Sequence, residues 1–371
     1  MRRWALLVAA ALAAAGCGHP LSPDPAPPPP QTAASLGRSD WPVLGADRPV
    51  LGVNLYALSD YPAATVRADG TRMIGYIRHV LKADAVAIVW NFYSPNRYGH
   101  DVGPSRDTLS ARNVGILTRI AQRAGLQVEY RPVILVPGQA NPWAGLIVPY
   151  PEQDWFSNYY RAELPYLKIA QRLHVPEFVT ATELMELNTS SHWPSFFADV
   201  SRVYHGVISY SAWDGDYFGH DPSVNGRPAP PFQVAEPELL PAKYLGMDMY
   251  WHLDLPATAT TAQVTAAWDR LFGKVPASVL RRTAIDETGI QAREGAYQDP
   301  GDLTATGRQS EQVQANWFTA ACRMVARYHM RGVFFWKVDL TDNPAHPATS
   351  LSTFEGRRGV AAISDCARIL H

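Results

Sequence analysis

The chain has 371 residues, 47% of them hydrophobic and 18% charged, which is enough to bury one large core. Its formal net charge of −1 provides neither a basic field for nucleic acid nor an acidic tail.

The first residues predict an export signal. Residues 1–3 carry positive charge, and residues 4–15 form an apolar stretch too short to span a bilayer as a mature helix. Ala-Ala-Gly before Cys17 resembles the lipobox of bacterial lipoproteins, in which that cysteine is acylated. We expect a signal peptide over 1–17 and a lipid anchor on Cys17, which would hold the protein on the extracytoplasmic side of the bacterial membrane. An ordinary signal peptide with a chance cysteine is the alternative.

Residues 18–42 are rich in proline and favour polyproline II. Such a tether reaches on the order of 60 Å at about 3.1 Å per residue, so an anchored domain could act on polymer away from the bilayer. Residues 43–371 form one predicted domain.

Strand-like and helix-like runs alternate along that domain. The eight strand candidates are 50–56, 86–91, 127–135, 177–183, 205–210, 244–250, 282–287 and 332–337. Most are continuous apolar runs, which is typical of parallel strands covered on both faces. Helix-like stretches lie between them, at 66–82, 107–124 (with Thr108 and Ser110 as candidate caps), 154–174, 192–204, 260–274 and 311–330.

Eight alternating units predict an α/β fold closed into a (β/α)8 TIM barrel, in preference to a doubly wound sheet. No Gly-x-Gly-x-x-Gly follows the first strand, which excludes a dinucleotide-binding fold. Long loops follow several strands on the side where barrels build active sites: 92–106, 136–153, 211–233, 288–310 and 338–353. Irregular segments of that length are uncommon unless they serve a function.

Two glutamates end strand candidates on that side. Glu183 ends the fourth strand and Glu287 ends the seventh. Hydrolysis of a glycosidic bond with retention needs one carboxyl as acid and then base, and a second as nucleophile, in environments that protonate one and ionise the other. By position we assign Glu183 as the acid/base and Glu287 as the nucleophile. The alternative for Glu183 is a cap of the helix that follows it.

Further segments carry a family resemblance. They are Arg131-Pro132-Val133, Trp143-Ala144-Gly145, Trp155-Phe156-Ser157-Asn158-Tyr159, Thr182-Glu183-Leu184, His205-Gly206-Val207-Ile208-Ser209-Tyr210 and Tyr244-Leu245-Gly246-Met247-Asp248-Met249-Tyr250. In order and spacing the chain resembles the clan A retaining glycosidases and, more narrowly, the family 113 glycoside hydrolases, over about residues 50–340. The resemblance implies a (β/α)8 barrel, a retaining endo-β-1,4-mannanase activity on polysaccharide, and no cofactor.

The resemblance also implies roles at matching positions. Trp336 would form the floor of the −1 sugar subsite, Tyr250 would hydrogen-bond the nucleophile, and Arg131 would pair with a carboxylate and hold it ionised. A core plug for Trp336 and a structural salt bridge for Arg131 are the alternatives. Further candidates for substrate binding are loop aromatics and residues at strand ends: Trp143, Trp213, Tyr217, Trp251, Asn54, Tyr56 and Asn91.

Some positions depart from the family pattern or stand beside it. Thr182 replaces the asparagine that in many clan A enzymes holds the sugar 2-hydroxyl, and this bears on substrate choice because that hydroxyl is axial in mannose. Asp214 and Asp216 would make a weak Ca²⁺ site, and a solvated loop explains them better. Strand alternation predicts that Asp286 points away from Glu287.

Two other classes of protein share parts of this pattern. A non-catalytic carbohydrate-binding or cell-wall lipoprotein would use the same aromatics without needing the two glutamates in hydrolytic geometry. A metal-dependent hydrolase would need clustered ligands, but the histidines are scattered without ligand spacing and no metal is expected: His100, His192, His205, His220 and His252.

The two remaining cysteines, Cys322 and Cys366, fall on the last two predicted helices. They either form a disulfide, which export permits, or stay separate buried thiols. The sequence shows no sign of oligomerisation, and we expect a monomer.

Overall fold

The computed structural model describes residues 41–139, 142–219, 241–346 and 350–371. The predicted signal peptide, the anchor at Cys17 and nearly all of the proline-rich tether lie outside the described residues, as do His220 and part of the 211–233 loop.

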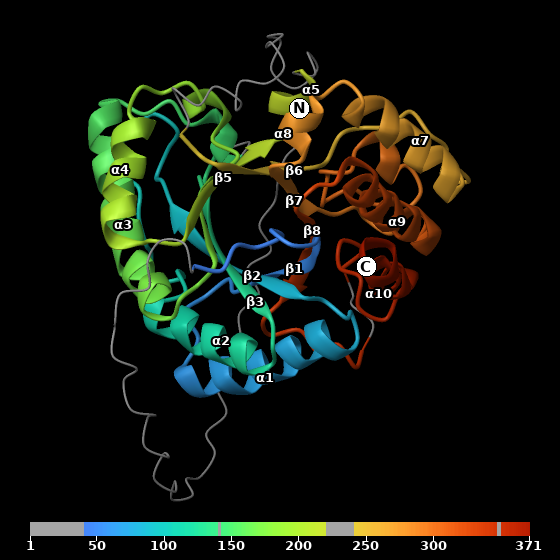
Figure 1. Cartoon of the computed structure of the whole chain (residues 1–371), viewed down its shortest axis with the longest axis horizontal. Coiled ribbons are helices and arrows are strands. Elements are labelled where there is room, and N and C mark those ends of the chain that lie inside the picture. The colour runs from blue at the N-terminus through green and yellow to red at the C-terminus, as the bar shows by residue number, and fades with distance from the viewer. Residues whose placement is uncertain (1–40, 140–141, 220–240, 347–349) are drawn as a thin grey trace, which may run out of the picture.

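Eight parallel strands close into a barrel in chain order, and helices surround it (Figure 1). The strands are β1 Val50–Tyr56, β2 Ala85–Tyr93, β3 Gln127–Leu135, β4 Glu177–Thr182, β5 Val207–Trp213, β6 Tyr244–Asp248, β7 Thr283–Thr288 and β8 Gly332–Asp339. The predicted (β/α)8 barrel is confirmed. Strands β1 and β3 have the predicted bounds, and the other strands differ from prediction by one to three residues at an end.

Long helices cover the outside of the barrel. They are α1 Ala63–His79, α2 Ala111–Arg123, α3 Glu152–Arg172, α4 Trp193–Val203, α7 Thr261–Phe272, α9 Glu311–Tyr328 and α10 Arg358–Leu370. Shorter elements are α5 Gly215–Phe218, α8 Ala277–Leu280 and the 3₁₀ turns Ala144–Leu146, Met185–Leu187 and Ala296–Gln298. Of the described helices, none is both long and apolar enough to cross a membrane.

The helices form where sequence and packing agree. Helix α7 begins with a capping box, in which Thr260 and Gln263 satisfy each other's backbone N–H groups. Its apolar side chains Val264, Trp268 and Leu271 are buried, as their spacing predicts. At α2, Ser110 is the N-cap residue without a side-chain cap, and the Thr108 hydroxyl donates to the Asn91 carbonyl instead.

The first described residues cover the N-terminal end of the barrel. The indole N–H of Trp41 donates to the carbonyl of Val175, just before β4, over 3.1 Å. Arg331, just before β8, donates to the Leu44 carbonyl over 2.6 Å and forms a bidentate pair with Glu177 at 2.5 and 3.1 Å. This end is therefore closed by side chains and by the entering chain, and it lies opposite the long loops.

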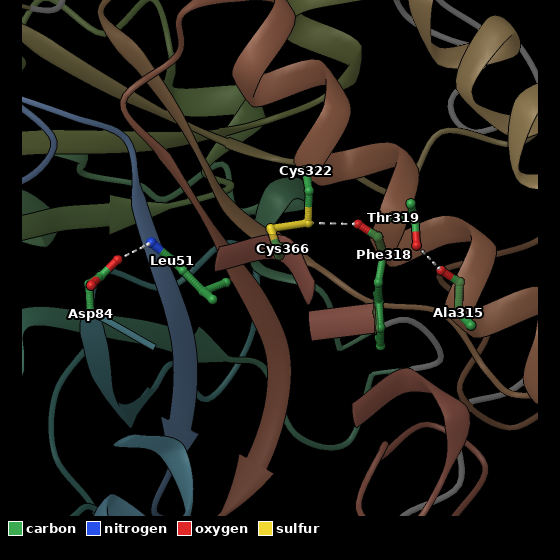
Figure 2. The surroundings of a disulfide bond; sticks show 7 residues. All are labelled: Leu51, Asp84, Ala315, Phe318, Thr319, Cys322 and Cys366. Carbon is green, nitrogen blue, oxygen red and sulfur yellow. Dashed lines mark hydrogen bonds between the residues drawn. A yellow bond between two sulfur atoms is a disulfide. The ribbon is translucent and has the colours of Figure 1, made fainter. Parts of the chain in front are cut away.

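The last two long helices are joined covalently. A disulfide links Cys322 on α9 to Cys366 on α10, with 5.6 Å between the Cα atoms, and both side chains are fully buried (Figure 2). Of the two alternatives open for these cysteines, the structure shows the bridge.

Candidate active site

A cavity of about 850 Å³ opens at the C-terminal ends of the strands. Most strands bring a residue to its wall, among them Tyr56 from β1, Asn91 from β2, Glu287 from β7 and Trp336 from β8. Glu183 follows β4 and also lines it. The two predicted catalytic glutamates therefore share one cavity. A second cavity, of about 810 Å³, lies by the β2–α2 loop and α3, and no predicted site residue lines it.

Glu183 follows β4 directly and has an unusual backbone conformation. Its φ is +54°, in the left-handed region that non-glycine residues rarely adopt and that often marks functional sites. Its backbone N–H donates to the Ser211 carbonyl over 2.8 Å, and the indole N–H of Trp143 donates to its Oε2 over 2.6 Å. Burial, followed by the charges of Asp248 and Glu287, raises the pKa of Glu183 well above its usual value. This environment favours the protonated carboxyl.

Glu287 has a different set of partners. Tyr250 donates its hydroxyl to Oε1 over 2.8 Å, and Tyr56 donates to Oε2 over 3.1 Å. Nη2 of Arg131 lies 3.5 Å from Oε2. Burial and the Asp248 charge raise the pKa of Glu287 to about 7, while Arg131 and the two tyrosines act against that rise. Of the two glutamates, Glu287 has the surroundings that stabilise a carboxylate more strongly.

The prediction that Asp286 points away from Glu287 is wrong. The register of β6 and β7 shifts between the pairs Met247–Ile285 and Asp248–Glu287, so β7 has one extra residue there. Both acidic side chains reach the guanidinium of Arg131, with Asp286 Oδ2 3.7 Å from Nη1. Simple alternation fails because the bulge turns two consecutive side chains inward.

Three of the predicted site residues lie behind the cavity wall. Arg131, Asn54 and Tyr217 are fully buried and do not line the cavity. Asn54 donates to the Asp286 carbonyl over 3.1 Å, and the Tyr217 hydroxyl donates to the Gly246 carbonyl over 2.8 Å. Arg131 does pair with carboxylates, because its Nη2 bonds Asp248 and lies 3.5 Å from Oε2 of Glu287.

The remaining aromatic candidates line the cavity. Trp143 and Trp213 meet edge to face with ring centroids 5.5 Å apart, and Trp336 meets Tyr56 in the same way at 6.2 Å. Trp251 lines the cavity as well. Flat apolar rings of this kind, with a few polar groups between them, are typical of ligand sites.

Thr182 and the aspartates after β5 make their hydrogen bonds within the protein. Thr182 lines the cavity, but its hydroxyl donates to the Pro132 carbonyl over 3.1 Å. Asp214 and Asp216 are buried, so the solvated-loop interpretation is wrong. Asp214 accepts the Tyr250 N–H over 2.7 Å, and Asp216 accepts from Asn188 over 2.7 Å. Over the described ranges, no three His, Cys, Asp or Glu side chains are grouped so that they could hold a metal ion.

Sequence reasoning missed Asp248 and Ser211. Asp248 ends β6 with no exposed surface, accepts Nη2 of Arg131 at 2.5 Å on each oxygen, and accepts the Ser211 hydroxyl over 2.7 Å. An acid inside the apolar run Leu245–Met249 was the available signal, because a buried charge needs a partner.

Comparison with known proteins points to one family. Residues 103–218 match the family described as Glycoside Hydrolase Family 113. A solved GH113 β-1,4-mannanase has a TM-score of 0.70 at 15% identity, covering 86% of this chain and 99% of that one. The GH113 β-mannanase from Alicyclobacillus acidocaldarius has a TM-score of 0.65 at 15% identity, over 88% and 99% of the two chains. The endo-β-1,4-mannanase from Thermotoga petrophila gives 0.53 at 11% identity, over 88% and 77%.

Likeness at these identities shows a shared barrel. No curated protein sequence is significantly similar to the chain. The family match, however, runs through β3, β4 and β5 and includes Glu183. On this match and on the shared fold, the chain is a glycoside hydrolase that resembles family 113.

Proposed function

We propose that this enzyme hydrolyses β-linked mannan with retention of configuration, through Glu183 and Glu287. The observation that supports this most is the contrast between the two glutamates on one cavity. Glu287 accepts two tyrosine hydroxyls and faces a guanidinium, whereas Glu183 accepts a neutral indole N–H. Such a contrast suits one ionised and one protonated carboxyl.

The proposed reaction has two displacements. A carboxylate oxygen of Glu287 bonds to the anomeric carbon as the glycosidic C–O bond breaks, and Glu183 gives its proton to the departing oxygen. Glu183, now a carboxylate, then takes a proton from water. The water oxygen bonds to the anomeric carbon and displaces Glu287, so both glutamates return to their first state.

Mannan is proposed as the substrate because of the relatives. The three solved structures described above are named as mannanases. The tryptophans around the cavity fit the flat faces of pyranose rings. We further propose that acylated Cys17 holds the enzyme on the membrane surface, since the residues before it resemble a lipobox.

The test is hydrolysis of β-mannan, β-glucan and xylan by the purified protein, with Glu287→Gln as a variant of nearly equal shape. We expect reducing ends from mannan with wild type alone, and NMR should show the β-anomer first. Wild-type turnover by the variant would remove the nucleophile assignment, and an α-anomer first would show inversion. Binding without cleavage by both proteins would favour the non-catalytic alternative.

The acid/base assignment has its own test. Glu183→Ala should cripple hydrolysis of mannan, because the departing sugar oxygen then has no proton donor. Azide should restore turnover of an activated aryl glycoside, whose leaving group needs no proton, by replacing water in the second displacement. Unaltered activity of Glu183→Ala on mannan would exclude the role.

A further inference from the structure

Asp248 is a buried carboxylate that the two-displacement reaction does not use. Nη2 of Arg131 lies 2.5 Å from both of its oxygens, and the Ser211 hydroxyl donates to Oδ1 over 2.7 Å. All three residues are fully buried. Asp248 therefore makes no contact with a substrate in the cavity, and its function must pass through these partners.

Each partner of Asp248 reaches one of the catalytic glutamates. The same Nη2 of Arg131 that bonds Asp248 lies 3.5 Å from Oε2 of Glu287. The carbonyl of Ser211, whose hydroxyl bonds Asp248, accepts the backbone N–H of Glu183 over 2.8 Å. One carboxylate thus connects to the nucleophile through β3 and to the acid/base through β5.

The neighbouring glycine makes room for this arrangement. A Cβ on Gly246 would stand 1.9 Å from Oδ2 of Asp286 and 2.5 Å from the Ser211 hydroxyl oxygen. Two residues before Asp248, β6 therefore lacks a side chain where the carboxyl of Asp286 and the hydroxyl of Ser211 approach the strand. The interior of a (β/α)8 barrel is usually filled by layers of apolar side chains. At this level of the barrel, Gly246 leaves that space to charged and polar groups instead.

We propose that Asp248 is a positioning residue that holds Glu183 and Glu287 in their relative arrangement, through Ser211 and Arg131 respectively. The inference rests on the catalytic roles proposed above for the two glutamates. Asp248 holds Arg131 through close contacts and so keeps it from forming a full ion pair with Glu287. The guanidinium therefore stabilises the carboxylate of Glu287 only in part. Ser211, held by Asp248, keeps its carbonyl on the backbone N–H of Glu183.

The charged and titratable groups around Asp248 determine in which direction its removal shifts the pKa values of Glu183 and Glu287. The ionisable groups that face it are Arg131 on β3, Asp286 and Glu287 on β7, Glu183 after β4, Tyr210 and Asp214 on or after β5, Tyr250 after β6 and Tyr56 on β1. The negative charge of Asp248 raises the pKa of both Glu183 and Glu287. Removing it should lower both, and should also free Nη2 to bond Glu287.

The experiment is the pH profile of kcat/KM for Asp248→Asn, which keeps the shape and removes the charge. We expect both limbs to move to lower pH by about one unit or more, as is usual when a close like charge is lost. The matched control is Glu129→Gln. It replaces a carboxyl of the same barrel interior that is as deeply buried and that is not among the groups that shift the pKa of Glu183 or Glu287. Both limbs of its pH profile should therefore stay in place.

A second variant covers the case in which Asp248→Asn does not fold, since it leaves Arg131 without its partner. Arg131→Lys keeps the charge balance, but a single ammonium nitrogen cannot replace both Nη2, which contacts Asp248 and Glu287, and Nη1, which faces Asp286. The acidic limb should then move to higher pH. The inference would be overturned if folded Asp248→Asn or Arg131→Lys kept the wild-type pH profile of kcat/KM while Glu183→Ala and Glu287→Gln were inactive. Turnover by Glu287→Gln would instead overturn the proposed function.

Discussion

The indole N–H of Trp143 donates to Oε2 of Glu183 over 2.6 Å and joins the loop after β3 to the carboxyl that follows β4. The bond orients the proposed acid/base and favours its ionised form. Trp143→Phe keeps a ring at the cavity wall and removes the donor. We expect kcat to fall about tenfold and the alkaline limb of the pH profile to move upward. A wild-type profile would show that the contact is not functional.

The two tyrosines on Glu287 give a paired prediction. Tyr250→Phe and Tyr56→Phe each remove one hydroxyl that stabilises the carboxylate. Each should raise the pKa of Glu287, move the acidic limb to higher pH and lower kcat about tenfold. Tyr250→Phe should have the larger effect, because its bond is 2.8 Å against 3.1 Å. Equal kcat/KM across pH for wild type and both variants would contradict the assignment.

The wild-type pH profile should be bell-shaped. Activity requires ionised Glu287, whose pKa is raised to about 7, so kcat/KM should fall as pH decreases through about 7. It also requires protonated Glu183, whose pKa is raised well above its usual value, so activity should fall at a higher pH. The check is kcat/KM on a soluble mannan over a wide pH range. An acidic limb near the ordinary glutamate pKa would contradict this description of the site.

Replacing both Cys322 and Cys366 by serine should lower the stability of the fold and leave the catalytic activity unchanged. The disulfide closes a separation of 44 residues between α9 and α10, and its loss should cost about 2–4 kcal/mol of unfolding free energy. Thermal unfolding measures the effect, and reduction of the wild type is the control. The bond lies among the outer helices, so kcat at room temperature should be kept. An unchanged Tm would show that the bridge adds no stability.

Cys17→Ser should release the enzyme from membranes if the lipid anchor forms as proposed. Fractionation of cells that express each form would place the wild type with membranes and the variant in the soluble fraction. Continued membrane retention of the variant would contradict the anchor. Equal mannan hydrolysis by the two forms would confirm that the substitution left the barrel intact.

Much of the barrel could be predicted from sequence because its strands are continuous apolar runs. The runs 50–56 and 127–135 have the bounds of β1 and β3. The spacing of apolar residues along a helix predicted which of its faces packs on the barrel, as in α7. Glu183 and Glu287 could be found because both end strands on the loop-rich side, and the structure brings them to one cavity.

Other parts of the site depend on features that strand alternation does not contain. The extra residue in β7 puts Asp286 beside Glu287 on the guanidinium of Arg131, and nothing in the run Thr283–Thr288 marks it. The pair Arg131–Asp248 spans 117 residues and exists only once the barrel has closed. The left-handed backbone at Glu183 is likewise set by tertiary packing, since glutamate has no preference for that conformation.

The way the first described residues enter the barrel has a consequence for how the enzyme meets its substrate. Trp41 and Leu44 bond to residues just before β4 and β8, at the face opposite the cavity. The described chain therefore begins at the end of the barrel that lies opposite the cavity. A polymer can therefore approach the cavity from the opposite side of the barrel without passing Trp41.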